Sequence, residues 1–65
     1  MITVNGESLS LCSGETLAQF LLRRGYEKSR VAVERNGQIV PKAQFDALVL
    51  EEGDTLEVVC FVGGG

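Results

Sequence analysis

Apolar and polar residues alternate at the start of the chain, the pattern of a β-strand with one buried face. Ile2 and Val4 fall on one side of the first extended segment. After an Asn-Gly pair at positions 5 and 6, Leu9 and Leu11 repeat the pattern. Asn-Gly between two alternating runs is a strong hairpin signal, because both residues tolerate a positive φ. Residues 1–12 are therefore predicted to form a β-hairpin.

The spacing of apolar residues then changes to that of an α-helix. Leu17, Phe20 and Leu21 are spaced i, i+3 and i+4, which places them on one face. Thr16, with Gln19 three residues later, fits a capping box at the start of the helix. We expect a short helix after Thr16 that packs its apolar face on a sheet, with those three side chains in the core.

The rest of the chain is predicted to be mostly extended. Val31 and Val33 begin a strand, and Pro41 ends a later extended piece because proline cannot donate to a sheet ladder. Phe45 is expected to turn inward from a single turn. The expected elements are a strand from residue 31 to an Asn-Gly turn at 36–37, an extended piece at 38–40, a turn at 42–47, a brief edge strand at 48–50, a turn at 52–54 and a last, longest strand at 55–62.

The order of these elements predicts an α+β domain. A hairpin, one helix and several further strands fit a mixed sheet of four to five strands with the helix packed across it. The last strand is expected to pair in parallel with the first, through a right-handed crossover that contains the helix. This arrangement is the β-grasp, or ubiquitin-like, fold. We predict one domain over residues 1–62 and a glycine tail at 63–65.

The last strand has apolar residues on both of its faces. Strict alternation turns Leu56 and Val58 inward and leaves Val59 and Phe61 outward. Exposed apolar side chains beside a chain end suit a docking surface, and with Val62 they are candidates for contact with a partner. The alternative is that Val59 and Phe61 pack in the core, as a bulge in this strand would allow.

The chain ends on three glycines, Gly63, Gly64 and Gly65. Glycine lacks a side chain to pack and has high backbone entropy, so we expect a slender, mobile tail. At roughly 3.3–3.6 Å per residue, three extended residues reach about 10 Å, enough to enter a narrow channel in another protein. The only reactive group of this tail is the α-carboxylate of Gly65. A frayed end without function is the alternative.

Composition indicates a small domain that is stabilised by its core alone. The chain has 65 residues, of which 45% are hydrophobic, with two cysteines and no histidine. A disulfide framework or a structural zinc site normally needs more ligands, so neither is expected. No apolar run approaches the ~18 residues of a membrane span, and the N-terminus lacks a signal-peptide pattern. We therefore expect a cytoplasmic protein that does not bind membranes.

The two cysteines, Cys12 and Cys60, are expected to pack as small free hydrophobes, with Cys60 facing inward. In the predicted sheet the first strand separates them by two strand spacings of about 4.8 Å, beyond the ~7 Å that a disulfide tolerates between Cα atoms. A persulfide carrier or a redox pair is the alternative.

Charge argues against several functions. The net charge is −3, which disfavours nucleic acid as a ligand. With no histidine and no expected cleft, no pair of carboxylates can serve as acid–base machinery, so neither catalytic residues nor a metal site is predicted.

The segment that leads to the tail is mostly acidic, which suits a partner with a basic docking surface. The acidic residues in this approach to the tail are Asp46, Glu51, Glu52, Asp54 and Glu57.

Four segments, in this order, resemble a known family. They are Gly14-Glu15-Thr16-Leu17, Val33-Glu34-Arg35-Asn36-Gly37-Gln38-Ile39-Val40-Pro41-Lys42, Glu52-Gly53-Asp54 and Phe61-Val62-Gly63-Gly64-Gly65. Together with the length and the absence of residues after the glycines, they resemble the bacterial ThiS family, the ubiquitin-like sulfur carriers of thiamine thiazole synthesis.

The resemblance implies a function for Gly65. A ThiF-like adenylyltransferase would use ATP and Mg²⁺ to form the acyl-adenylate. Sulfur from a cysteine desulfurase persulfide would displace AMP and leave a thiocarboxylate, from which thiazole synthase takes the sulfur. The chain would then be a co-substrate that binds no cofactor, not an enzyme. Two alternatives stay open: sulfur delivery to molybdopterin, sulfur amino acid or natural-product synthesis, and a ubiquitin-like modifier that joins lysines.

Overall fold

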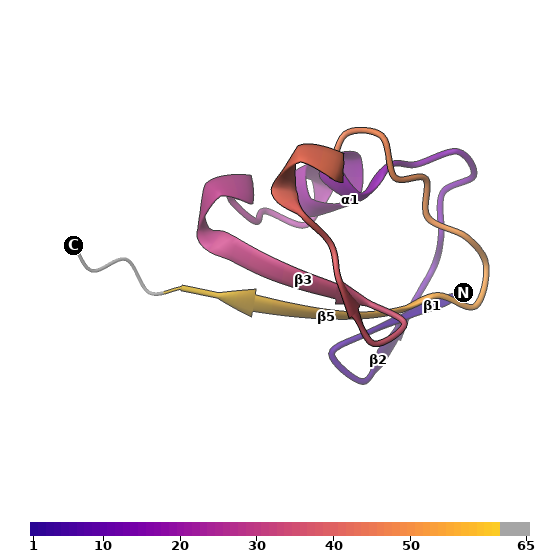
Figure 1. The fold of residues 1–65 in the computed structure, drawn as a ribbon. Coiled ribbons are helices and arrows are strands. Elements are labelled where there is room, and N and C mark those ends of the chain that lie inside the picture. The colour runs from indigo at the N-terminus through magenta and orange to yellow at the C-terminus, as the bar shows by residue number, and fades with distance from the viewer. Residues whose placement is uncertain (62–65) are drawn as a thin grey trace.

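The computed structural model describes residues 1–61, which form a five-stranded mixed sheet with one α-helix across it (Figure 1). The predicted β-grasp architecture is confirmed. The strands lie in the order β2-β1-β5-β3-β4. The elements are β1 (Ile2–Val4), β2 (Glu7–Leu9), α1 (Leu17–Arg23), the 3₁₀ turn η1 (Lys28–Arg30), β3 (Val31–Arg35), β4 (Gln38–Ile39), the 3₁₀ turn η2 (Lys42–Gln44) and β5 (Thr55–Cys60).

Strand β5 lies at the centre of the sheet. It pairs in parallel with β1, where Thr3 lies opposite Thr55, and antiparallel with β3, from Leu56 opposite Arg35 to Cys60 opposite Val31. The β1–β2 and β3–β4 pairs are antiparallel hairpins. The predicted parallel pairing of the first and last strands is therefore confirmed. A central position means that β5 has hydrogen-bonded neighbours on both sides.

Local sequence signals account for the turns and for the start of the helix. Asn5 and Asn36 have φ angles of 50° and 51°, so both Asn-Gly pairs form the predicted left-handed turns. The Thr16 hydroxyl accepts a hydrogen bond from the Gln19 N–H at 3.2 Å, and the Gln19 side chain accepts one from the Thr16 N–H at 3.0 Å. The predicted capping box is thus present. The second strand is shorter than expected and ends at Leu9.

The core lies between α1 and the sheet. Leu17, Phe20 and Leu21 are buried as predicted, and Phe45 turns inward from η2 to join them. The other buried apolar side chains are Ile2, Val4, Val31, Val33, Leu50, Leu56 and Val58. Within residues 1–61, no helix has the length and apolar character needed to cross a membrane.

The predicted edge strand at residues 48–50 is wrong. Val49 forms an isolated bridge with Thr16, the residue before α1. The Leu17 N–H donates to the Leu48 carbonyl at 2.8 Å, and the Leu50 N–H donates to the Glu15 carbonyl at 2.9 Å. The segment pairs with the entry to the helix because Leu50 is buried there, while β2 and β4 occupy the two edges of the sheet.

Candidate functional site

The exit of strand β5 is the candidate functional site, because the chain continues from there to the glycines. The Phe61 N–H donates to the Arg30 carbonyl at 2.8 Å, one residue beyond the strand. Backbone hydrogen bonds to β3, and to Arg30 directly before it, therefore hold the main chain as far as Phe61. Four predicted site residues lie outside the described residues: Val62, Gly63, Gly64 and Gly65.

The Asn5 side chain extends the contact between β1 and β5. The Val58 N–H donates to the Asn5 side-chain oxygen at 2.8 Å, and the Asn5 amide nitrogen donates to the Val58 carbonyl at 3.1 Å. Strand β1 ends at Val4, so this amide supplies the hydrogen bonds that the next peptide of the strand would have made. From the sequence, Asn5 was interpreted only as a turn residue, and a local pattern holds no signal for a contact with Val58.

A second asparagine positions the start of β5. The Asn36 side chain accepts from the Thr55 N–H at 2.9 Å and donates to Asp54 at 3.1 Å. Arg35 donates to Asp54 at 2.9 Å, and the Glu51 N–H also donates to Asp54 at 2.9 Å. Burial opposes the charge on the Asp54 carboxylate. The hydrogen bonds from Glu51, Arg35 and Asn36 outweigh that effect, so the pKa of Asp54 lies below its usual value.

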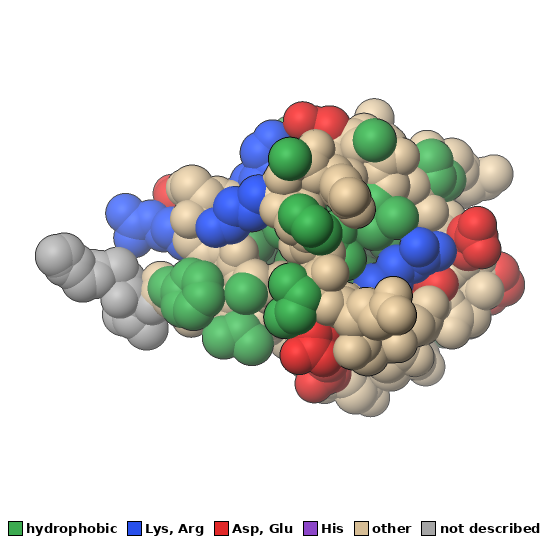
Figure 2. All heavy atoms as spheres, in the orientation of Figure 1, with side chains coloured by type: hydrophobic (Ala, Val, Ile, Leu, Met, Phe, Trp, Pro, Cys, Tyr) green, Lys and Arg blue, Asp and Glu red, His purple; other side chains and the backbone are tan. Residues whose placement is uncertain are grey.

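The sheet face opposite α1, which we call the open face, has exposed apolar side chains beside the exit. Val59 and Phe61 are 56% and 55% exposed, as strict alternation predicts, and no bulge interrupts the pairing of β5 with β3. Ile39 on β4 is 67% exposed and was missed from the sequence. Figure 2 shows hydrophobic side chains gathered beside the exit of β5. Val59 and Phe61 offer an apolar contact surface beside the exit, and Ile39 lies farther from it, level with Glu57 and two strands away.

The predictions for the cysteines were partly wrong. Both are free, as expected, but both are exposed instead of packed as small hydrophobes. Cys60 lies opposite Val31, so it does face the helix side of the sheet. Cys60 is exposed because it lies beyond Val58, which is the last buried side chain of β5. Cys12 lies after β2, outside any strand.

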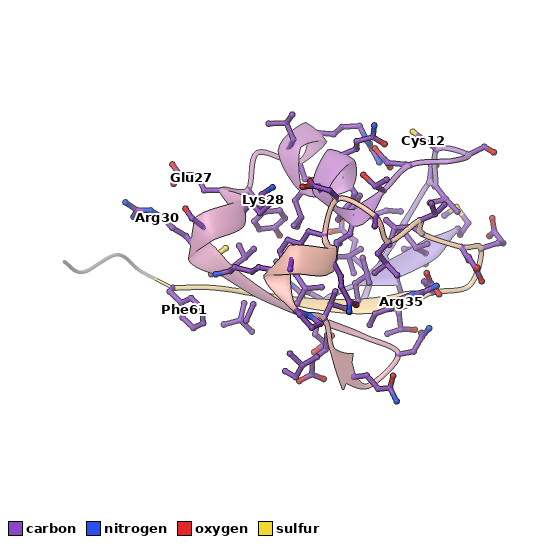
Figure 3. The ribbon with its side chains drawn as sticks, turned by 45° about the horizontal axis from the view of Figure 1, so that its top comes forward. Cys12, Glu27, Lys28, Arg30, Arg35 and Phe61 are labelled. Carbon is purple, nitrogen blue, oxygen red and sulfur yellow. The ribbon has the colours of Figure 1, made fainter. Side chains whose placement is uncertain are left out.

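The predicted acidic approach to the tail is wrong for three of its five residues. Glu51, Glu52 and Asp54 precede β5 in the sequence and therefore lie at its opposite end, where the Gly53 N–H donates to the Met1 carbonyl at 3.0 Å. The residues of η1, including Arg30, lie at the exit instead (Figure 3). Figure 2 shows Lys and Arg side chains on the exit side of the molecule and acidic side chains at the far end, although each end also has side chains of the opposite charge.

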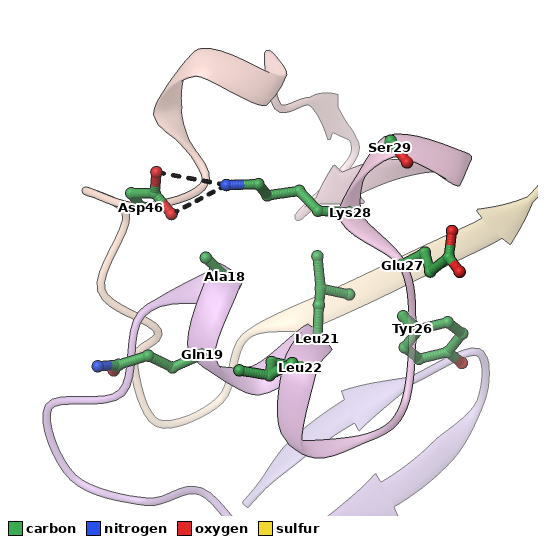
Figure 4. A pocket seen from close by; sticks show the side chains of 9 residues that line it. All are labelled: Ala18, Gln19, Leu21, Leu22, Tyr26, Glu27, Lys28, Ser29 and Asp46. Carbon is green, nitrogen blue, oxygen red and sulfur yellow. Dashed lines mark hydrogen bonds and ion pairs between the residues drawn. The ribbon is translucent and has the colours of Figure 1, made fainter.

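A groove of about 590 Å³ lies on the helix side of the molecule. Leu21, Leu22 and Tyr26 form much of its apolar wall, and the ion pair between Lys28 and Asp46, at 3.3 Å, spans its rim (Figure 4). The groove holds no pair of groups suited to acid–base chemistry. It is separate from the open face, because α1 and the open face lie on opposite sides of the sheet.

Comparison with known proteins gives consistent matches over the whole chain. The family model for the ThiS family matches residues 1–65. A thiazole synthase from Magnetococcus marinus is 44% identical over 64 residues, which are 98% of this chain and 20% of that protein. The chain therefore spans about a fifth of the length of that relative. The sulfur carrier protein ThiS of Bacillus subtilis is 33% identical over 66 residues, with 100% of both chains covered.

A solved structure has the same fold. The crystal structure of the thiamine biosynthesis protein ThiS from Geobacter metallireducens matches with a TM-score of 0.76 and 30% identity, covering 98% of this chain and 97% of that one. The family model, the relatives and the structural match agree with the segments that carry the resemblance. The chain belongs to the ThiS family.

Proposed function

We propose that this protein is a sulfur carrier that delivers sulfur from a Gly65 thiocarboxylate to thiazole formation in thiamine biosynthesis. The observation that carries the proposal is the position of β5. The strand lies at the centre of the sheet and leads directly toward the terminal glycines, and the Phe61 N–H is still hydrogen-bonded to Arg30 beyond its end. The whole-chain match to the ThiS family supports the same function.

The chemistry proceeds at the α-carboxylate of Gly65. A carboxylate is a poor electrophile, so a ThiF-like adenylyltransferase first uses ATP and Mg²⁺ to form the acyl-adenylate and release pyrophosphate. The terminal sulfur of a persulfide supplied by a cysteine desulfurase then attacks the acyl carbon, and AMP leaves. The resulting acyl disulfide is reduced by a thiol, which takes up the other sulfur in a new disulfide and releases the thiocarboxylate. In this scheme the domain is a substrate of its partner enzymes and contributes no catalytic residue and no bound cofactor.

Thiazole synthase is the proposed acceptor of the sulfur. A protein of that name from Magnetococcus marinus matches 98% of this chain within a fifth of its own length. A segment similar to this chain is therefore part of a protein named thiazole synthase, which supports a working partnership between this chain and thiazole synthase. The location of this protein in the cytoplasm stays a prediction.

Small residues at the end of the chain are part of the proposal. A Cβ atom on the last residue would narrow the space around the carboxylate and restrict the backbone of a tail that enters an enzyme channel. Exposed Val59 and Phe61, with Val62, are proposed to contact the partner that receives the tail. Docking on the body of the domain and reaction at the last residue are then separate tasks.

Intact mass spectrometry tests the function. The purified protein is incubated with the adenylyltransferase, a cysteine desulfurase, cysteine, ATP–Mg²⁺ and a thiol reductant. We expect a mass increase equal to the exchange of one oxygen atom for sulfur. The Gly65→Ala variant should keep the fold, checked by circular dichroism, and lose this product. If the unaltered protein is recovered instead as an adduct on lysines of other proteins, the modifier alternative replaces the carrier function.

The identity of the acceptor is tested separately. Thiocarboxylated protein is mixed with thiazole synthase and its small-molecule substrates, and thiazole formation is followed together with the return of the carboxylate mass. Activity of the Gly65→Ala variant at the rate of the unaltered protein would contradict the proposal. Transfer to a different sulfur-accepting enzyme, without transfer to thiazole synthase, would favour another biosynthetic pathway.

A further inference from the structure

The turn η1 ends the hydrogen-bonded ladder between β3 and β5. Val31 lies opposite Cys60, so the next pair outward along the sheet is Arg30 and Phe61. In a continuing antiparallel ladder this pair would exchange two backbone hydrogen bonds. The Phe61 N–H does donate to the Arg30 carbonyl at 2.8 Å, but the Arg30 N–H donates to the Glu27 carbonyl at 2.9 Å, inside η1. The winding of η1 therefore takes Arg30 out of regular pairing.

The exit of β5 is held from the β3 side of the sheet. On the β1 side, the hydrogen bonds of β5 within residues 1–61 end at Val58, which the Asn5 side chain binds. Beyond Val58, the strand is held by its pairing with β3 and by the single bond from Phe61 to Arg30. The conformation of η1 therefore determines the residue at which the chain can leave the sheet.

Little within η1 itself stabilises the turn. It has three residues, none of which is buried, and its N-cap residue, Glu27, makes no capping hydrogen bond through its side chain. Turns of the 3₁₀ type have poorer hydrogen-bond geometry than an α-helix. The ion pair between Arg30 and Glu27 is exposed, and exposed ion pairs contribute little to stability. Contacts from another part of the fold are needed to keep η1 wound.

Two side chains from residues 42–46 supply such contacts. The Lys42 ammonium group donates to the Ser29 carbonyl at 3.2 Å. Asp46 pairs with Lys28 at 3.3 Å (Figure 4). Phe45, between the two in the sequence, is buried in the core. Residues 42–46 are therefore fixed to the body of the domain and hold η1 from outside.

Lys42 makes the stronger of the two contacts. A hydrogen bond from an ammonium group to a carbonyl is charge-assisted, and a lysine beside the last carbonyls of a helical turn is favourable. Lys42 forms no ion pair within residues 1–61, so no acidic neighbour there competes for it. Both side chains of the pair between Lys28 and Asp46 are exposed, which makes that pair the weaker contact.

We propose that Lys42, assisted by Asp46, keeps η1 wound and thereby sets the length of tail that can enter a partner enzyme. Without these contacts η1 unwinds, the Arg30 N–H binds the Phe61 carbonyl, and the ladder extends along the tail. Each residue drawn into the ladder shortens the reach of the tail by roughly 3.3 Å. Lys42 is thus a positioning residue that acts through η1. The inference rests on the proposed function, because it concerns how the last residue reaches an active site.

Solution NMR of the free protein tests the structural part without any partner. If the ladder extends in the register of β3 and β5, Ser29 comes opposite Val62, and the Gly63 N–H binds the Lys28 carbonyl. Lys42→Ala should therefore produce a nuclear Overhauser effect between the Hα atoms of Ser29 and Val62. The Gly63 amide should exchange with solvent at least about twofold more slowly, the value for a ladder extended in half of the molecules.

Two variants control for the loss of a charge. Lys42→Arg keeps a cationic donor and should behave like the unaltered protein. Arg24→Ala removes another exposed cation, at the end of α1, which forms no ion pair within residues 1–61, and it should leave the exchange of Gly63 unchanged. Unchanged exchange in the double variant Lys42→Ala/Asp46→Ala would overturn the proposal.

Steady-state kinetics of adenylation, followed by pyrophosphate release with the adenylyltransferase, test the consequence for the reaction. Lys42→Ala should lower kcat about tenfold and change KM less than about twofold, because the body of the domain is unaltered and only the reach of the reacting end differs. One glycine inserted after Gly63 in the Lys42→Ala background should restore kcat, since it returns the lost length. The same insertion in the unaltered protein should not raise kcat.

The inserted glycine separates tail length from other causes. A kcat lost through misfolding or through a missing contact with the enzyme would not respond to a longer tail. Unchanged kcat for Lys42→Ala, or a loss that the inserted glycine leaves in place, would overturn the proposal.

Failure of this inference is distinguishable from failure of the carrier function. If the unaltered protein forms the thiocarboxylate while Lys42→Ala neither slows the exchange of Gly63 nor lowers kcat, the inference fails and the carrier function stands. If the unaltered protein forms no thiocarboxylate while Lys42→Ala still slows the exchange of Gly63, the carrier function fails. The role of Lys42 in ending the ladder then stands.

Discussion

The side chain of Asn5 combines two roles that are usually performed by different residues. Its backbone adopts φ 50° to form the hairpin turn, and its amide makes two hydrogen bonds to Val58 of the neighbouring strand. Asn36 does the same at the other end of β5 with Thr55 and Asp54. Because each asparagine closes a hairpin and also binds the central strand, a change at either position affects more than its own turn.

Replacing Asn5 with glycine tests this second role. Glycine keeps the positive φ and removes only the amide, which leaves the Val58 N–H and carbonyl without these partners. We expect the free energy of unfolding to fall by about 1–3 kcal/mol, measured by urea denaturation. Gln38→Ala, on the short edge strand β4, serves as the control and should change stability little. Equal stability of Asn5→Gly and the unaltered protein would contradict the assigned role.

Helix α1 is short, with seven residues from Leu17 to Arg23, and such a helix depends on its ends and on its packing. Its buried face covers the core through three side chains. At its N-terminus the capping box satisfies backbone groups that have no partner inside the helix. The entry to α1 is also fixed by the pairing of residue 49 with Thr16. The cap therefore holds both the helix and the segment that leads to Asp54.

We predict that Thr16→Ala lowers the free energy of unfolding by about 0.5–2 kcal/mol. The substitution removes the hydroxyl that accepts from the Gln19 N–H at 3.2 Å. Thermal or urea denaturation followed by circular dichroism gives the value. Gln44→Ala, at an exposed position in η2, is the matched control. If the two variants lose the same amount of stability, the cap contributes nothing beyond an ordinary surface residue.

Elements could be predicted from the sequence where neighbouring residues determine the structure. They could not be predicted where the structure depends on contacts with residues far away in the chain. The Asn-Gly turns and the Thr16 cap depend on nearby residues, and both were predicted correctly. Val49 was placed wrongly because its partner lies far away in the chain, before α1. Alternation correctly predicted the side of β5 on which Cys60 lies. It did not predict that Cys60 is exposed, because the strand continues past the core.

At the scale of the whole molecule, order along the chain differs from order in space. The acidic residues before β5 are near the tail in sequence, yet β5 carries the chain across the sheet before the tail begins. The exit is instead bordered by η1, with Arg30 and Glu27 paired at 3.1 Å. The contact of Lys42 with the Ser29 carbonyl was likewise not predicted, since it joins two turns that only the fold brings together.

The acidic end of the molecule also determines its response to pH. Asp54 is only 5% exposed, and its pKa is lowered in the folded state. A lowered pKa means that the charged form stabilises the fold above the ordinary aspartate pKa, and that this stability is lost as the pH falls through the folded-state value. We therefore expect the free energy of unfolding to decrease as the pH is lowered below about 4.

Urea denaturation at a series of pH values measures this dependence, with the Asp54→Asn variant alongside. Asp54→Asn should be less stable at neutral pH, because its amide cannot accept from Arg35, Asn36 and the Glu51 N–H together. It should also show a flatter decrease on acidification. An identical pH profile for Asp54→Asn and the unaltered protein would assign the acid sensitivity to other carboxylates.

The parallel pairing of β1 with β5 also fixes where a label can be attached. Thr3 lies opposite Thr55, and Phe61 is six residues further along. Met1 precedes Thr3 by two residues, so Met1 and Phe61 are separated by eight residues along the sheet, roughly 26 Å at ~3.3 Å per residue. An affinity handle or fluorophore on Met1 would disturb only the exposed ion pair with Glu52, a minor loss. Protein immobilised by its amino end would present the exit of β5 away from the support, ready for an enzyme in solution.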